Sequence, residues 1–188
     1  MLDAVLKKYA FKIRITVKGA ISLLCIALAI GLPQIAHVAG GATAGARWLP
    51  MYLPVLLAGC VLGSLWGVGV GIASPVASFG FTSLIIGNAM PVLARLPYMI
   101  VELAVFGLVS GLLSRKIEQN SLFAFPAVLC AQVAGRLVNL IVGLIAGQNS
   151  VAAWNVIQSG LIGLYVQALV VPFIAIILAK VVKNDDAR

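Results

Sequence analysis

Six apolar runs, each about 20 residues long, constrain the fold of this chain more than any other feature. A helix of about 20 residues, rising about 1.5 Å per residue, crosses the roughly 30 Å of hydrocarbon in a bilayer. Because the runs are apolar on every side, they exclude a membrane barrel, whose strands alternate apolar and polar residues. We expect spans at about 16–36, 51–71, 73–90, 96–116, 121–146 and 153–180.

The composition requires lipid around most of the chain. Of its 188 residues, 62% are hydrophobic and 10% are charged, and its mean hydropathy is +1.13. Such a chain cannot bury its apolar side chains in one soluble core. The expected fold is an all-α integral membrane protein, a compact bundle of six transmembrane helices in a single domain, 1–188. Within it, 1–15 form an amphipathic cytoplasmic segment, about 16–180 form the bundle and 181–188 form a charged tail.

The basic residues predict the topology, because Lys and Arg accumulate in cytoplasmic loops. An even number of spans puts both termini on one side. Ten of the 13 basic residues lie in the amino-terminal segment, the loop after the fourth span and the tail. The other side has only Arg47 and Arg95, and Arg136 lies inside a span. Both termini are therefore predicted to be cytoplasmic, in a multi-pass protein of the prokaryotic plasma membrane.

A cleaved signal peptide is an alternative for the first 45 residues, because Ala42-Thr43-Ala44 resembles a cleavage site. The apolar run from Gly19 to Ala36 is long for a signal peptide and contains Pro33 and Gln34. These features favour a first span.

Four glycines recur at every fourth position in the expected second span: Gly59, Gly63, Gly67 and Gly71. On one helix they would share a face and form a groove that another helix could approach at backbone distance. The groove is expected to serve packing within the chain. The alternative is a membrane scaffold or assembly protein whose groove receives a partner's helix.

Polar side chains inside the spans gather in the predicted outer half of the membrane. Counted from the span ends, Glu102, Asn139 and Gln158 lie about 8–10 Å below the outer boundary and Arg136 about 15 Å below it. Charged groups at this depth are costly unless they are paired or face a water-filled cavity. Two interpretations remain, a buried Glu102–Arg136 ion pair or an outward-facing pocket for a polar small molecule, and the pair could also form one wall of such a pocket. We expect both residues to line the pocket and to hold each other in place, with Arg136 offering donors to the ligand and Glu102 orienting the guanidinium.

Further candidates lie on the same side of the membrane. Asn88 and Asn155 are close to span ends, and the aromatic rings of Tyr52 and Trp154 could stack on a ligand, although such rings also favour membrane interfaces. The candidate substrate-binding residues are thus Tyr52, Asn88, Glu102, Arg136, Asn139, Trp154, Asn155 and Gln158.

Several classes of chemistry lack their motifs. The sequence has no P-loop, and its single histidine, His37, with three scattered cysteines provides neither a metal site nor a hydrolytic triad. We expect no enzyme, no metal and no cofactor. The basic residues form no stripe with interleaved aromatics, which argues against nucleic acid as a partner. A small secondary transporter is a weaker alternative, because Glu102 is the one carboxylate inside a span and no repeat is evident.

Several segments in order resemble a known family. These are Leu49-Pro50-Met51-Tyr52-Leu53-Pro54, Ser74-Pro75 with Ser78-Phe79, Met90-Pro91, Leu96-Pro97-Tyr98-Met99-Ile100-Val101-Glu102-Leu103-Ala104 and Gly107-Leu108-Val109-Ser110-Gly111. Over roughly 16–145 the chain resembles the substrate-binding S component of energy-coupling factor (ECF) transporters.

The resemblance implies a substrate-capture subunit for uptake of a vitamin or cofactor precursor at the extracellular face. It also implies partners: a membrane coupling protein and two ATPase subunits, with Ala27 and Gly31 as the candidate contacts on the first helix. Two departures affect segments beside the pocket, because Tyr52 stands where the family commonly has His, and Gly80 to Ala89 lengthen the passage before Met90-Pro91. Cobalamin, pantothenate, folate, a pyridoxine-like compound and a queuosine precursor therefore remain alternatives as the ligand.

Overall fold

All regular elements in the computed structural model are helices. The backbone is described for residues 2–41, 43–87 and 89–185, and the side chains for 16–41, 43–87 and 89–178. The elements are α1 (Leu2–Gly40), α2 (Ala44–Trp48), α3 (Tyr52–Leu62), α4 (Ser64–Phe81), η1 (Thr82–Ile86), η2 (Leu93–Arg95), α5 (Leu96–Leu112), α6 (Ser114–Gln119), η3 (Ser121–Phe123), α7 (Ala124–Ile145), α8 (Ser150–Ser159) and α9 (Leu161–Asp185).

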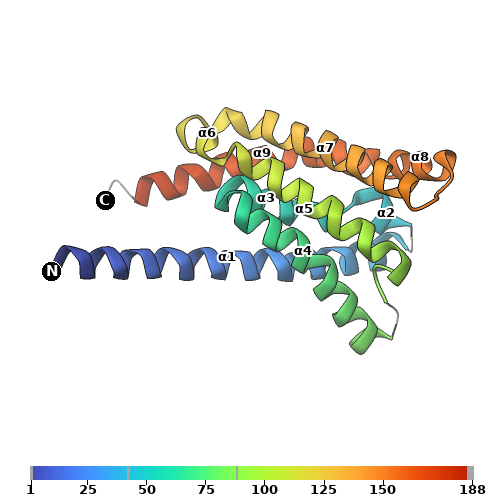
Figure 1. Cartoon of the computed structure of the whole chain (residues 1–188), viewed down its shortest axis with the longest axis horizontal. Coiled ribbons are helices and arrows are strands. Elements are labelled where there is room, and N and C mark those ends of the chain that lie inside the picture. The colour runs from blue at the N-terminus through green and yellow to red at the C-terminus, as the bar shows by residue number, and fades with distance from the viewer. Residues whose placement is uncertain (1, 42, 88, 186–188) are drawn as a thin grey trace.

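The expected number of spans is confirmed. Among the described residues, six segments are long and apolar enough to cross a membrane: Thr16–Gly40, Ala44–Leu62, Ser64–Ile86, Leu93–Leu112, Ser121–Ile145 and Leu161–Leu178. The start of α1 and the end of α9 lie at one end of the bundle, and α2 and α8 lie at the other (Figure 1). We call these the termini end and the cavity end. The predicted amphipathic segment 1–15 continues into the first span within α1, and its side chains lie outside the described residues.

The predicted second and third spans were wrong in their bounds. The second was placed at 51–71, but α3 ends at Leu62 and the chain turns at Gly63, where φ is +94°. A left-handed φ of this kind favours glycine. Gly63, which was predicted to lie on a helix face, therefore forms the turn between two antiparallel spans. The third span then begins at Ser64, earlier than the predicted 73, and continues through η1 to Ile86. The predicted sixth span, 153–180, is divided at Gly160 into α8 and α9.

The four-glycine groove on one helix is therefore also a wrong prediction. Gly59 lies on α3, while Gly67 and Gly71 lie on α4. A Cβ atom added to Gly67 would lie 2.5 Å from the carbonyl oxygen of Gly107 on α5, and one added to Gly71 would meet the backbone of Leu103. The glycines therefore hold α4 against α5 at backbone distance within this chain, as small residues do in membrane helix pairs.

Side-chain amides fix the elements that surround the cavity end. Gln167 on α9 donates to the carbonyl oxygens of Trp48 (3.2 Å) and Leu49 (2.8 Å), where α2 ends. Leu49 has a left-handed φ of 49°. Gln132 on α7 donates to the carbonyl oxygen of Leu164 at 2.9 Å. These bonds connect α9 to the end of α2 and α7 to the first turn of α9, and in lipid no water is present to replace such contacts.

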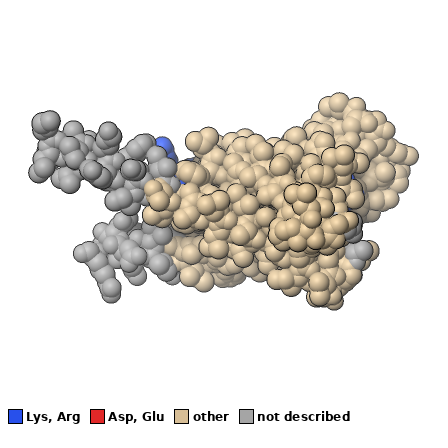
Figure 2. Space-filling view, turned by 90° about the horizontal axis from the view of Figure 1, so that it is seen from below, with Lys and Arg blue, Asp and Glu red and all other residues tan. Residues whose placement is uncertain are grey.

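The outer surface is suited to lipid. Leu84 and Ile145 are 87% and 82% exposed, and many other large apolar side chains share this exposure. Figure 2 shows a face on which very few charged side chains are visible. Arg115 and Lys116 belong to α6 at the termini end, whereas Arg47 belongs to α2 at the cavity end (Figure 1).

The contact between α4 and α5 gives a direct test of the fold. We expect Gly67→Leu to destabilise the protein by about 3 kcal/mol, the upper end of the usual cost of overpacking, because its side chain must displace the α5 backbone. The matched control is Gly69→Leu on the same helix, where an added Cβ meets nothing within 4 Å. Thermal unfolding of the purified variants in detergent measures the difference. Equal melting temperatures for the two variants would contradict the described packing.

Candidate functional site

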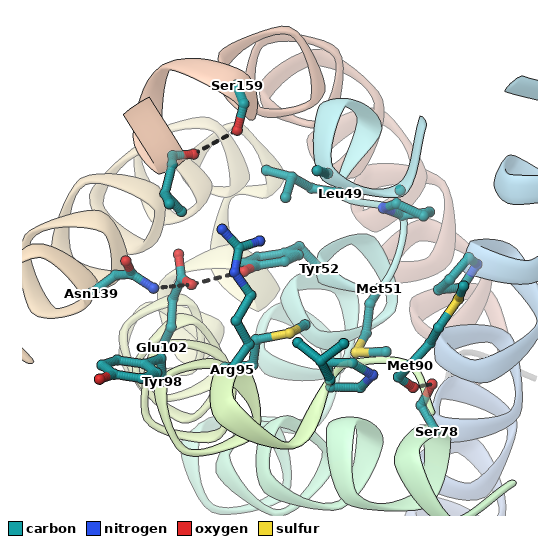
Figure 3. Close-up of a pocket in the computed structure, with 18 of the residues that line it drawn as sticks. Leu49, Met51, Tyr52, Ser78, Met90, Arg95, Tyr98, Glu102, Asn139 and Ser159 are labelled. Atoms are coloured by element: carbon teal, nitrogen blue, oxygen red, sulfur yellow. Dashed lines mark hydrogen bonds between the residues drawn. The ribbon is translucent and has the colours of Figure 1, made fainter. Parts of the chain in front are cut away.

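A cavity of about 290 Å³ lies at the cavity end of the bundle. Its walls come from α1, α2, α3, α4, α5, α7, α8 and the segment between η1 and η2. The lining residues Arg95 and Ser159 are themselves exposed, so the cavity opens to the surface at this end. The arrangement of side chains around it is drawn in Figure 3.

One wall of the cavity is built on the carboxylate of Glu102. Its Oε1 atom lies 3.0 Å from Arg136 Nη1. Its Oε2 atom accepts two hydrogen bonds of 2.8 Å, one from the Tyr52 hydroxyl and one from Asn139 Nδ2 (Figure 3). Glu102 is 1% exposed and Arg136 is 7% exposed. The buried charge is thus paired and hydrogen-bonded, which is the condition under which charges are tolerated inside a protein.

Aromatic contacts hold these groups in place. The Tyr52 ring meets the Phe106 ring edge to face, with centroids 5.1 Å apart. The Arg136 guanidinium carbon lies 5.4 Å from the centroid of the Tyr52 ring, within cation–π range. Tyr52 therefore contacts both members of the ion pair, donating to the carboxylate and presenting its ring to the guanidinium.

The sequence explains why three helices converge at this point. Glu102 and Phe106 are four residues apart on α5, and Arg136 and Asn139 are three apart on α7, so each pair shares one helix face. A Cβ atom added to Gly135 would collide with the Phe106 ring. The small residue thus lets Phe106 press against α7, which brings Glu102 within reach of Arg136 and Asn139.

Arg136 keeps unused donors. Its Nε and Nη2 atoms are buried and have no hydrogen-bond partner among the described residues. A Cβ atom added to Gly160 would lie 2.7 Å from Nη2, so the glycine between α8 and α9 leaves room for the guanidinium. Buried donors without partners each cost about 1–3 kcal/mol and require an explanation.

The opposite wall is formed by the long passage before the fourth span. Ser78 on α4 donates to the carbonyl oxygen of Met90 at 2.9 Å (Figure 3). The Thr82 hydroxyl accepts from the Met90 backbone N–H at 2.8 Å. These bonds attach Met90, and with it Pro91, to the end of α4, and both residues line the cavity. The bond between them is cis.

Four of the predicted site residues meet at the cavity: Tyr52, Glu102, Arg136 and Asn139. Trp154, Asn155 and Gln158 are exposed on α8 and are not among the lining residues, and Asn88 lies outside the described residues. Trp154, Asn155 and Gln158 lie on the separate helix α8 because the expected helix 153–180 is broken at Gly160. Whether these four residues contact a ligand remains a prediction.

Several lining residues were missed from the sequence: His37, Ser78, Arg95, Gln148 and Ser159. Arg95 was counted only as a topology charge, although its position one residue before the fourth span was a signal that it could reach the same face. On α1, Ala27 is exposed and Gly31 is partly exposed, with open space where a Cβ would lie. Their predicted contact with a partner remains a prediction.

The cavity wall combines charged groups, hydrogen-bonding groups and apolar side chains. Among the described residues there is no group of three or more His, Cys, Asp or Glu side chains that could hold a metal ion. Comparisons with models of protein families, with curated proteins and with solved structures find no match to this chain.

The ion pair can be tested by substitutions that remove each charge. We expect Glu102→Gln or Arg136→Gln alone to destabilise the protein by roughly 3–5 kcal/mol, because each leaves the other charge buried without its partner. The double variant should recover most of this loss, since no net charge stays buried. A double-mutant cycle on the unfolding free energy measures the coupling. Additive losses in the double variant would show that the two side chains do not interact.

Proposed function

We propose that this protein captures a small polar solute in the cavity, as the membrane subunit of an ATP-driven uptake transporter for a vitamin or cofactor precursor. The observation that carries the proposal is the charged cluster on the cavity wall. Glu102, Arg136, Tyr52 and Asn139 are brought together from three helices. Ionisable groups at membrane depth are expensive, and they characteristically mark substrate pathways.

The size of the cavity supports a small solute. Its volume of about 290 Å³ lies near the lower limit of ligand pockets, which hold about 300–1,000 Å³. At roughly 30 Å³ per water molecule, it accommodates the volume of about ten waters. Among the ligands that the family resemblance allows, this favours compounds of the size of pantothenate or a pyridoxine-like ring. Cobalamin is far larger and is disfavoured.

The geometry supports capture by a site that is already ordered. Tyr52, Asn139 and Arg136 are held by the carboxylate of Glu102 before any solute arrives. Binding then costs little side-chain entropy, which is the advantage of a preorganised pocket. The apolar lining from Leu49, Met51 and Met99 provides contact area for the non-polar part of the solute.

The family resemblance and the charge distribution support the rest of the proposal. Because basic residues accumulate on the cytoplasmic side, the termini end faces the cytoplasm and the cavity opens outward. The sequence has no P-loop, so energy comes from partner ATPases through a membrane coupling protein. The scaffold alternative loses its motivating observation, because the glycines of α4 pack against α5 of the same chain.

Capture can be tested by blocking the cavity. We expect mass spectrometry to find one small molecule released reproducibly from gently purified protein, and to find at least about tenfold less from Ala46→Trp. Ala46 lines the cavity and does not belong to the charged cluster, so an indole at this position is expected to take up space that the solute needs. The matched control, Ala152→Trp, alters an exposed position on α8 outside the lining. Equal release from both variants would place binding elsewhere.

The partners and topology can be tested with one fusion. Green fluorescent protein attached to the carboxy terminus should fluoresce, because it folds in the cytoplasm. When used as the affinity handle on native membranes, it should bring down a second membrane subunit and an ATPase. A fusion that fluoresces but repeatedly recovers neither partner would remove the energy-coupling part of the proposal, whereas a dark, full-length fusion would contradict the topology.

A further inference from the structure

The charges that line the cavity do not balance. Arg95 and Arg136 face one carboxylate, Glu102, which leaves one positive charge, with His37 taken as neutral. Glu102 is already engaged by Arg136, Tyr52 and Asn139. The cavity therefore has an uncompensated positive charge, which favours a negatively charged solute.

Arg136 carries the positive charge in the inner part of the cavity. Only its Nη1 atom is close to Glu102, while Nε and Nη2 have no hydrogen-bond partner among the described residues. Gly160 lies beside Nη2 and the arginine is 7% exposed, so a solute acceptor reaches these donors only when it is seated deep in the cavity. A guanidinium presents its donors in a planar fork that matches a carboxylate or a phosphate group.

Arg95 carries the positive charge at the mouth of the cavity. It is exposed at the start of α5, and its side chain forms no hydrogen bond or ion pair within the described part of the chain. Figure 3 shows it extending from η2 over the cavity, on the side of Tyr52 and Glu102. A cation at the mouth of a cleft with low-dielectric walls attracts anions from solution.

We infer that the captured solute is a small organic anion whose carboxylate or phosphate group binds between Arg136 and Arg95. The inference rests on the proposed function and adds the chemical class of the solute. Arg136 holds the anion in the depth of the cavity, and Arg95 closes over it from the rim. The rest of the solute meets the apolar wall, where Met51, Met99 and Pro91 lie.

The test identifies the solute and its charge together. Purified protein is immobilised in mild detergent and exposed to the deproteinised small-molecule extract of its native cells, and retained compounds are released by denaturation and identified by mass spectrometry. We expect one retained compound with an acid group that is ionised at pH 7. Its elemental composition distinguishes a carboxylate from a phosphate. The purified acid should bind at least about tenfold more tightly than its neutral amide or ester.

Three variants test the two arginines. Arg95→Gln should reduce retention at least about tenfold with an unchanged melting temperature, because the residue is exposed and unpaired. The Glu102→Gln/Arg136→Gln double variant removes the inner cation without leaving a buried charge, and retention should fall to background. Arg47→Gln, a basic residue at the same end outside the cavity lining, is the control and should retain the compound fully.

The outcomes separate this inference from the proposed function. A retained compound that is neutral or cationic, or one whose amide binds equally well, overturns the anion inference and leaves solute capture standing. Full retention by Arg95→Gln overturns the binding position between the two arginines. If the unmodified protein retains no compound above background, the proposed function fails, and this inference fails with it.

Discussion

The carboxylate of Glu102 is the interaction on which the cavity end depends, because it joins α3, α5 and α7 through Tyr52, Arg136 and Asn139. In lipid, a polar group that loses its partner cannot turn to water, so each of these contacts specifies where a helix must lie. Apolar packing between helices has no such specificity, since lipid tails are as apolar as leucine. One buried charge thus sets the relative positions of three spans in a bundle whose other contacts are mostly apolar.

Glu102 can act in this way because small residues bring the helices close enough. Gly67 and Gly71 place α4 against the backbone of α5, and Gly135 admits the Phe106 ring beside α7. With larger side chains at these positions the helices would separate, and a 3.0 Å contact between Glu102 and Arg136 would be out of reach. Close packing of the helices is therefore required for the polar cluster to form, and a substitution that separates the helices also breaks the cluster.

The sequence was sufficient to predict the number of spans and the meeting of Glu102 with Arg136, because both follow from apolar length and from the cost of charge in lipid. It misplaced features that depend on single glycines. Gly63 and Gly160 both lie inside predicted spans, and hydropathy does not distinguish a glycine within a helix from one that ends it. The error at Gly160 carried Trp154, Asn155 and Gln158 into the predicted pocket. Arg95 was missed as a cavity residue because its positive charge had been interpreted only as a signal of membrane topology.

The contacts of the ion pair distinguish two roles for its members. Oε2 of Glu102 accepts two hydrogen bonds, whereas Oε1 lies 3.0 Å from Arg136 Nη1 and accepts no hydrogen bond from the described residues. Arg136 uses one nitrogen in the pair and leaves Nε and Nη2 without partners. A pair that served stability alone would be expected to satisfy both members, since a buried unpaired donor costs about 1–3 kcal/mol. The two unpaired donors support the proposed role of Arg136 in binding, with Glu102 holding the guanidinium in position. The cost of these unpaired donors beside the cavity is explained if the solute supplies the missing hydrogen-bond acceptor.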